Sequence, residues 1–335
     1  MNRISDDILF RVEKPARYTG GELNSYVKNK DKVDVRFAFC FPDVYEVGMS
    51  HLGMKILYYI LNERDDTYCE RVFAPWPDME GLMRENNVPL YGLESKDPIS
   101  NFDFIGFTLQ YEMSYTNILN MLDLAGLSVR ASERGEGDPV VICGGPCAYN
   151  PEPLWNIADL FAIGESEDQI NEIIDLYKNC RGSKSEFLRK ACHIGGVYVP
   201  SFYDVGYNED GTVKSFEPIY EDVPAKVTKR IVKNLNEADY PDKLVVPFTD
   251  IVHDRIVLET FRAESRSGAE KIKQQAGNEQ GSSGRFSLIT CLFFCPESHF
   301  FYILLSKNAF FQTLNAENTQ MQKANAFLFY AIAVL

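Results

Sequence analysis

The sequence lacks any apolar run long enough to cross a bilayer, which needs about 20 residues. The longest such run covers residues 326–335. No basic stretch followed by an apolar core opens the chain, so a secretory signal is not expected. Basic residues are outnumbered, 34 Lys+Arg against 48 Asp+Glu, for a net charge of −14. This balance argues against a nucleic-acid groove or an anionic membrane surface, and we expect a cytoplasmic protein without a membrane span.

Aspartate is absent after Asp254, although the chain before it is rich in acids. Residues 263–335 carry 6 Lys+Arg and 5 Glu, a net +1, which leaves −15 on residues 1–262. The tail includes a Gln-, Gly- and Ser-rich stretch at residues 274–284, a composition typical of linkers. The Phe-rich sequence that follows has no clear period. We therefore expect a poorly ordered tail.

Strand and helix patterns alternate from residue 33 to residue 180. The expected strands cover residues 33–41, 68–73, 104–109, 140–143 and 160–163, and the expected helices residues 53–61, 78–86, 116–124 and 167–177. This alternation favours right-handed βαβ units and a sheet covered on both faces. The prediction is an α/β, doubly wound fold, Rossmann- or flavodoxin-like, with a mainly parallel sheet. In such sheets a small-molecule cofactor binds in the cleft at the carboxyl ends of the strands.

The pattern changes beyond the last of these helices. Residues 198–207 and 213–219 flank an Asp-Gly step and predict a β-hairpin. The apolar patterns at residues 245–248 and 256–260 predict further strands. We therefore divide the chain into an α/β domain with an N-terminal extension (1–182), a hairpin and connector (183–244), the start of another domain (245–262) and the tail (263–335).

Four segments together resemble the N-terminal half of a radical S-adenosyl-L-methionine (SAM) protein family that carries a cobalamin-binding-like domain. They are residues 41–53 (FPDVYEVGMSHLG), 143–146 (CGGP), 164–167 (GESE) and 253–262 (HDRIVLETFR). The resemblance spans roughly residues 8–262. It implies a cobalamin-binding-like Rossmann domain in the first half, the start of a radical SAM domain after residue 244, and iron–sulfur chemistry in the family.

The resemblance also implies cofactor contacts in the loop after the first strand. Cobalamin domains typically carry Asp-x-His-x-x-Gly there, with the His ligating cobalt and the Asp fixing its tautomer. This chain keeps Asp43 and Gly48 but has Tyr45 at the histidine position. A neutral phenol is a poor cobalt ligand, so the sequence allows cobalamin only without a histidine ligand. His51 is expected to cap or pack at a helix start.

Further candidate contacts follow the later strands. Thr108 and Leu109 match the end of the third strand, near the cofactor tail in the family. Gly144 and Gly145 resemble paired glycines that let a nucleotide tail pass close to the backbone, or they form a strand-to-loop turn before a proline. Glu165 binds a ribose or an amide, or is a solvated carboxylate at a helix start.

The cysteine motif expected after residue 262 is missing. In the family, Gly-Cys-x3-Cys-x2-Cys holds a 4Fe–4S cluster that binds SAM. The corresponding positions here hold Ala263, Glu264, Gly268 and Lys271. Carboxylate and ammonium groups cannot replace thiolates around iron, and Cys291 and Cys295 lack a third cysteine at that spacing. The sequence therefore supports neither cluster nor SAM binding, and predicts no catalytic or metal-ligating residue.

Three hypotheses follow for function. The leading one is a truncated N-terminal portion of a radical SAM protein, inactive alone; a shifted reading frame or an inserted segment would explain the lost motif. The alternative is a non-enzymatic module that binds a corrinoid or a nucleotide. A nicotinamide or flavin oxidoreductase would need Gly-x-Gly-x-x-Gly after the first strand, which residues 42–48 do not provide.

Overall fold

The computed structural model describes residues 4–180, 183–232, 238–253, 256–258 and 303–305. The chain divides into two compact units, Met1–Val252 and His253–Leu335. In the second unit, β9 (Ile256–Leu258) pairs antiparallel with β10 (Ile303–Leu305). Apart from β10, the predicted tail lies outside the described residues, and so do the positions of the missing cysteine motif.

The first unit is built on a six-stranded sheet in the order β2-β1-β3-β4-β5-β6. Its parallel strands are β1 (Val35–Phe41), β2 (Thr67–Phe73), β3 (Phe104–Thr108), β4 (Val140–Gly144) and β5 (Leu160–Ala162), and β6 (Val197–Tyr198) is antiparallel to β5. The predicted α/β fold with a mainly parallel sheet is confirmed. The strand order reverses between β1 and β3, so the switch point lies at the carboxyl ends of these two strands.

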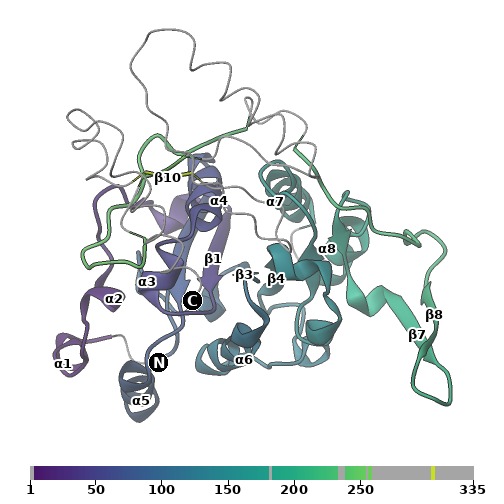
Figure 1. Ribbon diagram of the computed structural model, residues 1–335, viewed down its shortest axis with the longest axis horizontal. Helices are drawn as coiled ribbons and strands as arrows, with labels where there is room; N and C mark the ends of the chain where they lie inside the picture. Colours follow the sequence, from purple (N-terminus) through teal and green to yellow (C-terminus); the bar gives the residue numbers. More distant parts are fainter. Residues whose placement is uncertain (1–3, 181–182, 233–237, 254–255, 259–302, 306–335) are drawn as a thin grey trace, which may run out of the picture. The chain divides into compact units, whose positions relative to one another are not determined.

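Helices cover both faces of this sheet, as buried parallel strands require. At the end of α4 (Leu52–Glu63), the Arg64 guanidinium donates to Asn171 on α7 (Gln169–Asn179) at 3.1 Å. Similarly, Arg84 on α5 (Pro77–Asn86) donates to Asn120 on α6 (Tyr115–Leu124) at 2.7 Å. Figure 1 shows α4 and α7 on one side of the sheet and α6 on the other.

Shorter elements complete the first unit. The helices are α1 (Asp6–Leu9), α2 (Ala16–Thr19), α3 (Tyr45–Gly48) and α8 (Lys184–Ala191). Single 3-10 turns lie at Lys30–Lys32, Ile99–Asn101, Glu112–Ser114, Ala131–Glu133, Pro146–Tyr149, Glu152–Leu154 and Pro200–Phe202. On α8, the Phe187 ring packs edge-on against Phe104 of β3, with ring centroids 5.7 Å apart, which fixes this helix against the sheet.

Two predictions outside the main alternation need correction. The hairpin is confirmed as β7 (Tyr203–Tyr207) with β8 (Val213–Pro218), but its predicted first residue, Tyr198, belongs to β6 of the main sheet. The predicted strand at residues 245–248 is wrong, because this segment makes only an isolated antiparallel bridge between Val246 and Leu23. The backbone around Leu23 is irregular, so the bridge does not extend into a pair of strands. The predicted strand at 256–260 is found as β9, and its last two residues lie outside the described part.

Candidate functional site

The carboxyl ends of β3 and β4 bring four of the predicted site residues together. Thr108 lies opposite Gly144 in the register of the two strands. The Leu109 amide donates to the Gly144 carbonyl at 2.6 Å, and the Leu109 carbonyl accepts from the Cys147 amide at 3.0 Å. The Gln110 amide group donates to the Thr108 hydroxyl at 2.7 Å. Gln110 was not among the predicted site residues, and its side chain covers Thr108 where β3 ends.

Gly144, the last residue of β4, and Gly145, which follows it, differ in whether a side chain would fit. Gly145 has φ +97°, and a Cβ there would lie 2.9 Å from the Leu109 carbonyl oxygen. A Cβ on Gly144 would meet nothing closer than the Ala162 carbonyl oxygen at 3.5 Å, an ordinary contact. A side chain is therefore excluded at Gly145 by the turn itself, whereas Gly144 is tolerant. This geometry favours the strand-to-loop reading for Gly145, and a cofactor role for the pair stays a prediction.

The predicted site residues in the loop after β1, Asp43, Tyr45 and Gly48, make contacts within the protein. The Asp43 carboxylate accepts from the Val44 amide at 2.7 Å. A Cβ on Gly48 would lie 2.3 Å from the Phe73 ring, so this glycine permits close packing of α3 on β2. Tyr45 is 1% exposed and its hydroxyl donates to Glu22 at 2.7 Å. Burial, with the adjacent Glu22 carboxylate, raises the pKa of Tyr45, so the phenol stays neutral.

His51 caps α4, which confirms the expected role. Its Nδ1 accepts from the Met54 amide at 3.2 Å, and its ring lies 5.6 Å from the Phe41 ring, centroid to centroid. Burial lowers the pKa of His51 to about 4, while contact with Gln110 acts in the opposite direction. The imidazole is therefore neutral at neutral pH. His51, Gln110 and Thr108 form a line of polar groups at the switch point between β1 and β3.

Glu165 binds the connector that follows the hairpin. Its carboxylate accepts from the Val232 amide at 2.5 Å, and its own amide donates to the Arg230 carbonyl at 2.9 Å. Gly164 has φ +108°, and a Cβ there would lie 2.2 Å from the same carbonyl oxygen. The end of β5 is thus shaped to receive residues 230–232. In this structure the Glu165 carboxylate is bonded to the backbone amide of Val232. A ribose or amide contact for Glu165 stays a prediction.

The connector is attached again at the N-terminal segment. The Asn24 side chain donates to the Leu244 carbonyl at 2.9 Å, and the Val246 amide donates to the Leu23 carbonyl at 3.0 Å. Asn24 has φ +67°, a left-handed conformation that asparagine tolerates better than most residues. Residues 241–246, which we call the strap, are therefore fixed beside residues 23–24.

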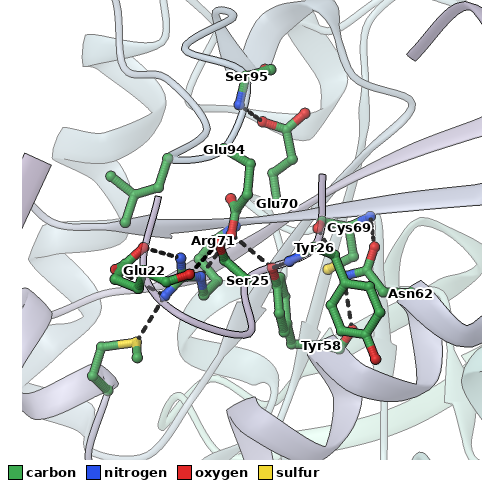
Figure 2. A network of polar contacts seen from close by, with 12 residues as sticks. Glu22, Ser25, Tyr26, Tyr58, Asn62, Cys69, Glu70, Arg71, Glu94 and Ser95 are labelled. Atoms are coloured by element: carbon green, nitrogen blue, oxygen red, sulfur yellow. Dashed lines mark hydrogen bonds and ion pairs between the residues drawn. The ribbon is translucent and has the colours of Figure 1, made fainter. Parts of the chain in front are cut away.

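A buried network of charges joins Glu22 of the N-terminal segment to Arg71 and Glu94 (Figure 2). Arg71 on β2 is 2% exposed, and its guanidinium donates to Glu22 at 2.7 Å and to Glu94 at 2.7 Å. The Tyr45 hydroxyl donates to Glu22 at 2.7 Å, and the Tyr58 hydroxyl donates to Glu94 at 2.9 Å. Two carboxylates thus share one guanidinium, and each is completed by a tyrosine. Buried charges persist when paired and hydrogen-bonded in this way.

The two carboxylates of the network differ in acidity. Burial works to raise the pKa of Glu22, but Arg71 and the Tyr45 hydroxyl outweigh it and hold that pKa below its usual value. Burial raises the pKa of Glu94 against the opposing effect of Arg71, and Glu70 adds to the rise. The network has no open position for a substrate, because the side chains of Glu22, Arg71 and Glu94 are at most 2% exposed. We therefore assign it a structural role. The sequence signal was the pair Glu70-Arg71 inside an expected strand.

Metal-binding chemistry has no site among the described residues, where no three His, Cys, Asp or Glu side chains gather. Four free cysteines are buried in this unit: Cys40, Cys69, Cys180 and Cys192. Burial raises the pKa of the Cys40 and Cys69 thiols, which makes thiolate formation unfavourable.

None of the helices in the described ranges is long and apolar enough to cross a membrane.

Comparison with known proteins identifies the relatives of this unit. Residues 53–200, from α4 to the turn after β6, match the family model described as radical SAM proteins, N-terminal. This match relates residues 53–200 to radical SAM proteins. An uncharacterized protein of Methanocaldococcus jannaschii is 28% identical over 156 residues, which cover 46% of this chain and 29% of that protein. The match thus spans less than a third of the relative's length. No solved structure matches the chain.

The match supports the radical SAM part of the expected resemblance over residues 53–200, and the cobalamin-binding-like character stays a prediction. The matched range includes Thr108, Gly145 and Glu165 but begins after Tyr45 and His51. In the loop after β1, the described side chains do not fit a lower axial ligand for cobalt. Tyr45 is neutral and bonded to Glu22, and the His51 Nδ1 is bonded to the Met54 amide.

Proposed function

We propose that this radical SAM-related chain is the N-terminal portion of an iron–sulfur protein and is inactive alone. Its sheet would serve as a non-catalytic module, and the chain would neither hold a 4Fe–4S cluster nor cleave SAM. The support is the match of residues 53–200 to the N-terminal family model, together with the absence of cysteine between residues 193 and 290. When bound, the cluster supplies the electron that cleaves the sulfonium of SAM.

Anaerobic reconstitution with iron and sulfide tests this proposal. The chain should retain no stoichiometric iron and show no thiolate-to-iron absorbance after desalting. A matched positive control restores the family spacing with the triple variant Glu264→Cys, Gly268→Cys, Lys271→Cys, which should bind iron under the same conditions. A stable cluster on the unaltered chain that disappears with Cys291→Ser and Cys295→Ser would contradict the proposal.

A second candidate is non-enzymatic binding of a corrinoid or a nucleotide at the carboxyl ends of the strands. It is favoured by apolar side chains left in solvent on the loops after β3 and β4. Tyr111 is 61% exposed, Met113 is 74% exposed, and Tyr149 is 54% exposed. Exposed apolar side chains beside a switch point are typical of a ligand surface. Because the loop after β1 offers no axial ligand, a corrinoid would bind here through its ring and tail alone.

Titration with hydroxocobalamin and, separately, with adenosine monophosphate distinguishes the two ligands. Saturable binding that weakens in the double variant Tyr111→Ser, Tyr149→Ser would support the candidate. Tyr207→Ser is the matched control, because Tyr207 is 63% exposed on the hairpin strand β7. Absence of binding by either ligand would leave the module without a cofactor of its own.

A further inference from the structure

A relay of hydrogen bonds at the switch point leads from a backbone amide of α4 to the Thr108 hydroxyl at the end of β3. The Met54 amide donates to His51 Nδ1 at 3.2 Å, and the His51 side chain is hydrogen-bonded to Gln110. The Gln110 amide group donates in turn to the Thr108 hydroxyl at 2.7 Å. Gly145 leaves room for this arrangement, because a Cβ there would lie 3.0 Å from the Gln110 side-chain nitrogen.

The backbone amide fixes the direction of every bond in the relay. A backbone N–H can only donate, so His51 Nδ1 is the unprotonated nitrogen of a neutral imidazole. The ring proton therefore lies on Nε2, which donates to the Gln110 carbonyl oxygen and leaves the NH2 group to face Thr108. A flipped Gln110 amide would set its NH2 group against the Nε2 proton, donor against donor. The geometry is thus consistent with one direction only.

The relay leaves the Thr108 hydroxyl as a hydrogen-bond donor. A hydroxyl has one proton and two lone pairs, and Gln110 occupies a lone pair. Among the described residues, no side chain or carbonyl accepts the Thr108 proton within hydrogen-bond distance. Thr108 is 7% exposed, and a buried donor without an acceptor costs free energy. An acceptor atom of a ligand at the switch point would remove that cost.

We propose that Thr108 donates a hydrogen bond to an acceptor oxygen of the bound ligand, and that Gln110 and His51 are positioning residues that orient its proton. This inference rests on the second candidate function, binding of a corrinoid or a nucleotide at the carboxyl ends of the strands. Cobalamin and nucleotides share such an oxygen in their phosphate groups, and cobalamin also carries amide carbonyls. A ligand group with only N–H donors would meet the donating hydroxyl and be disfavoured.

Nitrogen-15 NMR on the full chain without ligand tests the direction of the relay. The two ring nitrogens of a neutral histidine differ in chemical shift according to which one carries the proton. The His51 signals are assigned by their loss in His51→Asn. At neutral pH His51 should be protonated on Nε2 alone. Protonation on Nδ1, or on both nitrogens, would overturn the proposal, because Gln110 would then be oriented differently.

Titration with hydroxocobalamin and, separately, with adenosine monophosphate tests the contact with the ligand. For the ligand that binds, Thr108→Val should weaken binding about fivefold or more, because one hydrogen bond is lost. Thr108→Ser keeps the hydroxyl and should bind within about twofold of the unaltered chain. Gln110→Glu should weaken hydroxocobalamin binding at least as much as Thr108→Val, because the carboxylate accepts the Thr108 proton and turns it away from the ligand.

Thr67→Val is the matched control. Thr67 is also buried on a strand, but it lies at the amino end of β2 and its hydroxyl already donates to Asp66 at 2.8 Å, so binding should not change. Thermal unfolding checks that all variants fold. Unchanged affinity in folded Thr108→Val, or equal losses in Thr108→Val and Thr108→Ser, would overturn the proposal and leave the candidate function standing. No saturable binding of either ligand by the unaltered chain would overturn both.

Discussion

Replacing Arg71 by methionine should be among the most destabilising single changes in this protein. The guanidinium is 2% exposed and donates to Glu22 from two nitrogens, at 2.7 and 3.1 Å, and to Glu94 from a third at 2.7 Å. The variant keeps a similar volume but leaves two buried carboxylates, to which the Tyr45 and Tyr58 hydroxyls and the backbone amide of position 71 still donate. Removal of one partner from a buried ion pair costs about 3–5 kcal/mol of unfolding free energy, and we expect a loss in that range.

The loss of stability in Arg71→Met should depend on pH. Without the Arg71 guanidinium, only the remaining hydrogen bonds oppose burial, and we expect the native pKa of both glutamates to rise above the unfolded value of 4.5. A raised native pKa of an acid gives stability that is present below the unfolded pKa and is lost as the pH rises through the native pKa. The deficit of Arg71→Met relative to the unaltered protein should therefore be largest at neutral pH and shrink toward about pH 4.

Urea unfolding followed by circular dichroism measures the effect at both pH values. Arg84→Met is the matched control, because Arg84 is 45% exposed and pairs with Glu80 and Asp123 at the surface. Surface pairs are worth about 0–1 kcal/mol, so the control should change little. A loss below about 1 kcal/mol for Arg71→Met, or an equal loss at both pH values, would refute the account of the network.

Three further outcomes follow from the carboxyl ends of the strands. Gly145→Ala should cost about 2 kcal/mol or more while Gly144→Ala stays within about 1 kcal/mol, and equal urea midpoints for the two would contradict the contact at Leu109. The free energy of unfolding should fall as the pH drops from 6.5 to about 4, because the native pKa of His51 is lowered to about 4. The His51→Asn variant keeps a helix cap and should flatten this part of the plot of stability against pH. An unchanged slope in the variant would contradict this role of His51. Tyr45→Phe should cost about 1 kcal/mol and leave any cobalamin spectrum unaltered, whereas a spectral change would place the phenol at the cofactor.

The alternation of apolar strands and amphipathic helices was sufficient to predict the main sheet. Strands β3 to β5 are short apolar runs, and β1 and β2 are mainly apolar apart from their charged residues. Such runs can be recognised from the sequence without knowledge of tertiary contacts. Their predicted ends agree with the structure to within two residues. Helix α8 was missed because its sequence, KSEFLRKA, is short and mostly polar. The apolar run at residues 245–248 predicts a strand that does not form, because Val246 makes only an isolated bridge to Leu23.

Much of the site geometry depends on contacts that local sequence does not contain. Tyr45 follows β1, where a ligand was expected, but its hydroxyl is turned to Glu22, 23 positions earlier. Arg71 meets Glu22 across 49 positions and Glu94 across 23. Gly145 was singled out correctly for a glycine requirement, since positive φ leaves a local signal. The role of Glu165 could not be foreseen, because its partner is the backbone at Val232, 67 residues later.

The most direct test of the central claim is formation of 5′-deoxyadenosine from SAM. The full chain is reconstituted anaerobically with iron and sulfide, given a strong reductant, and assayed by chromatography. Our account predicts no 5′-deoxyadenosine above the protein-free background, because the thiolates that would hold the cluster are missing from the chain. Multiple turnovers that are lost on removal of iron would contradict it.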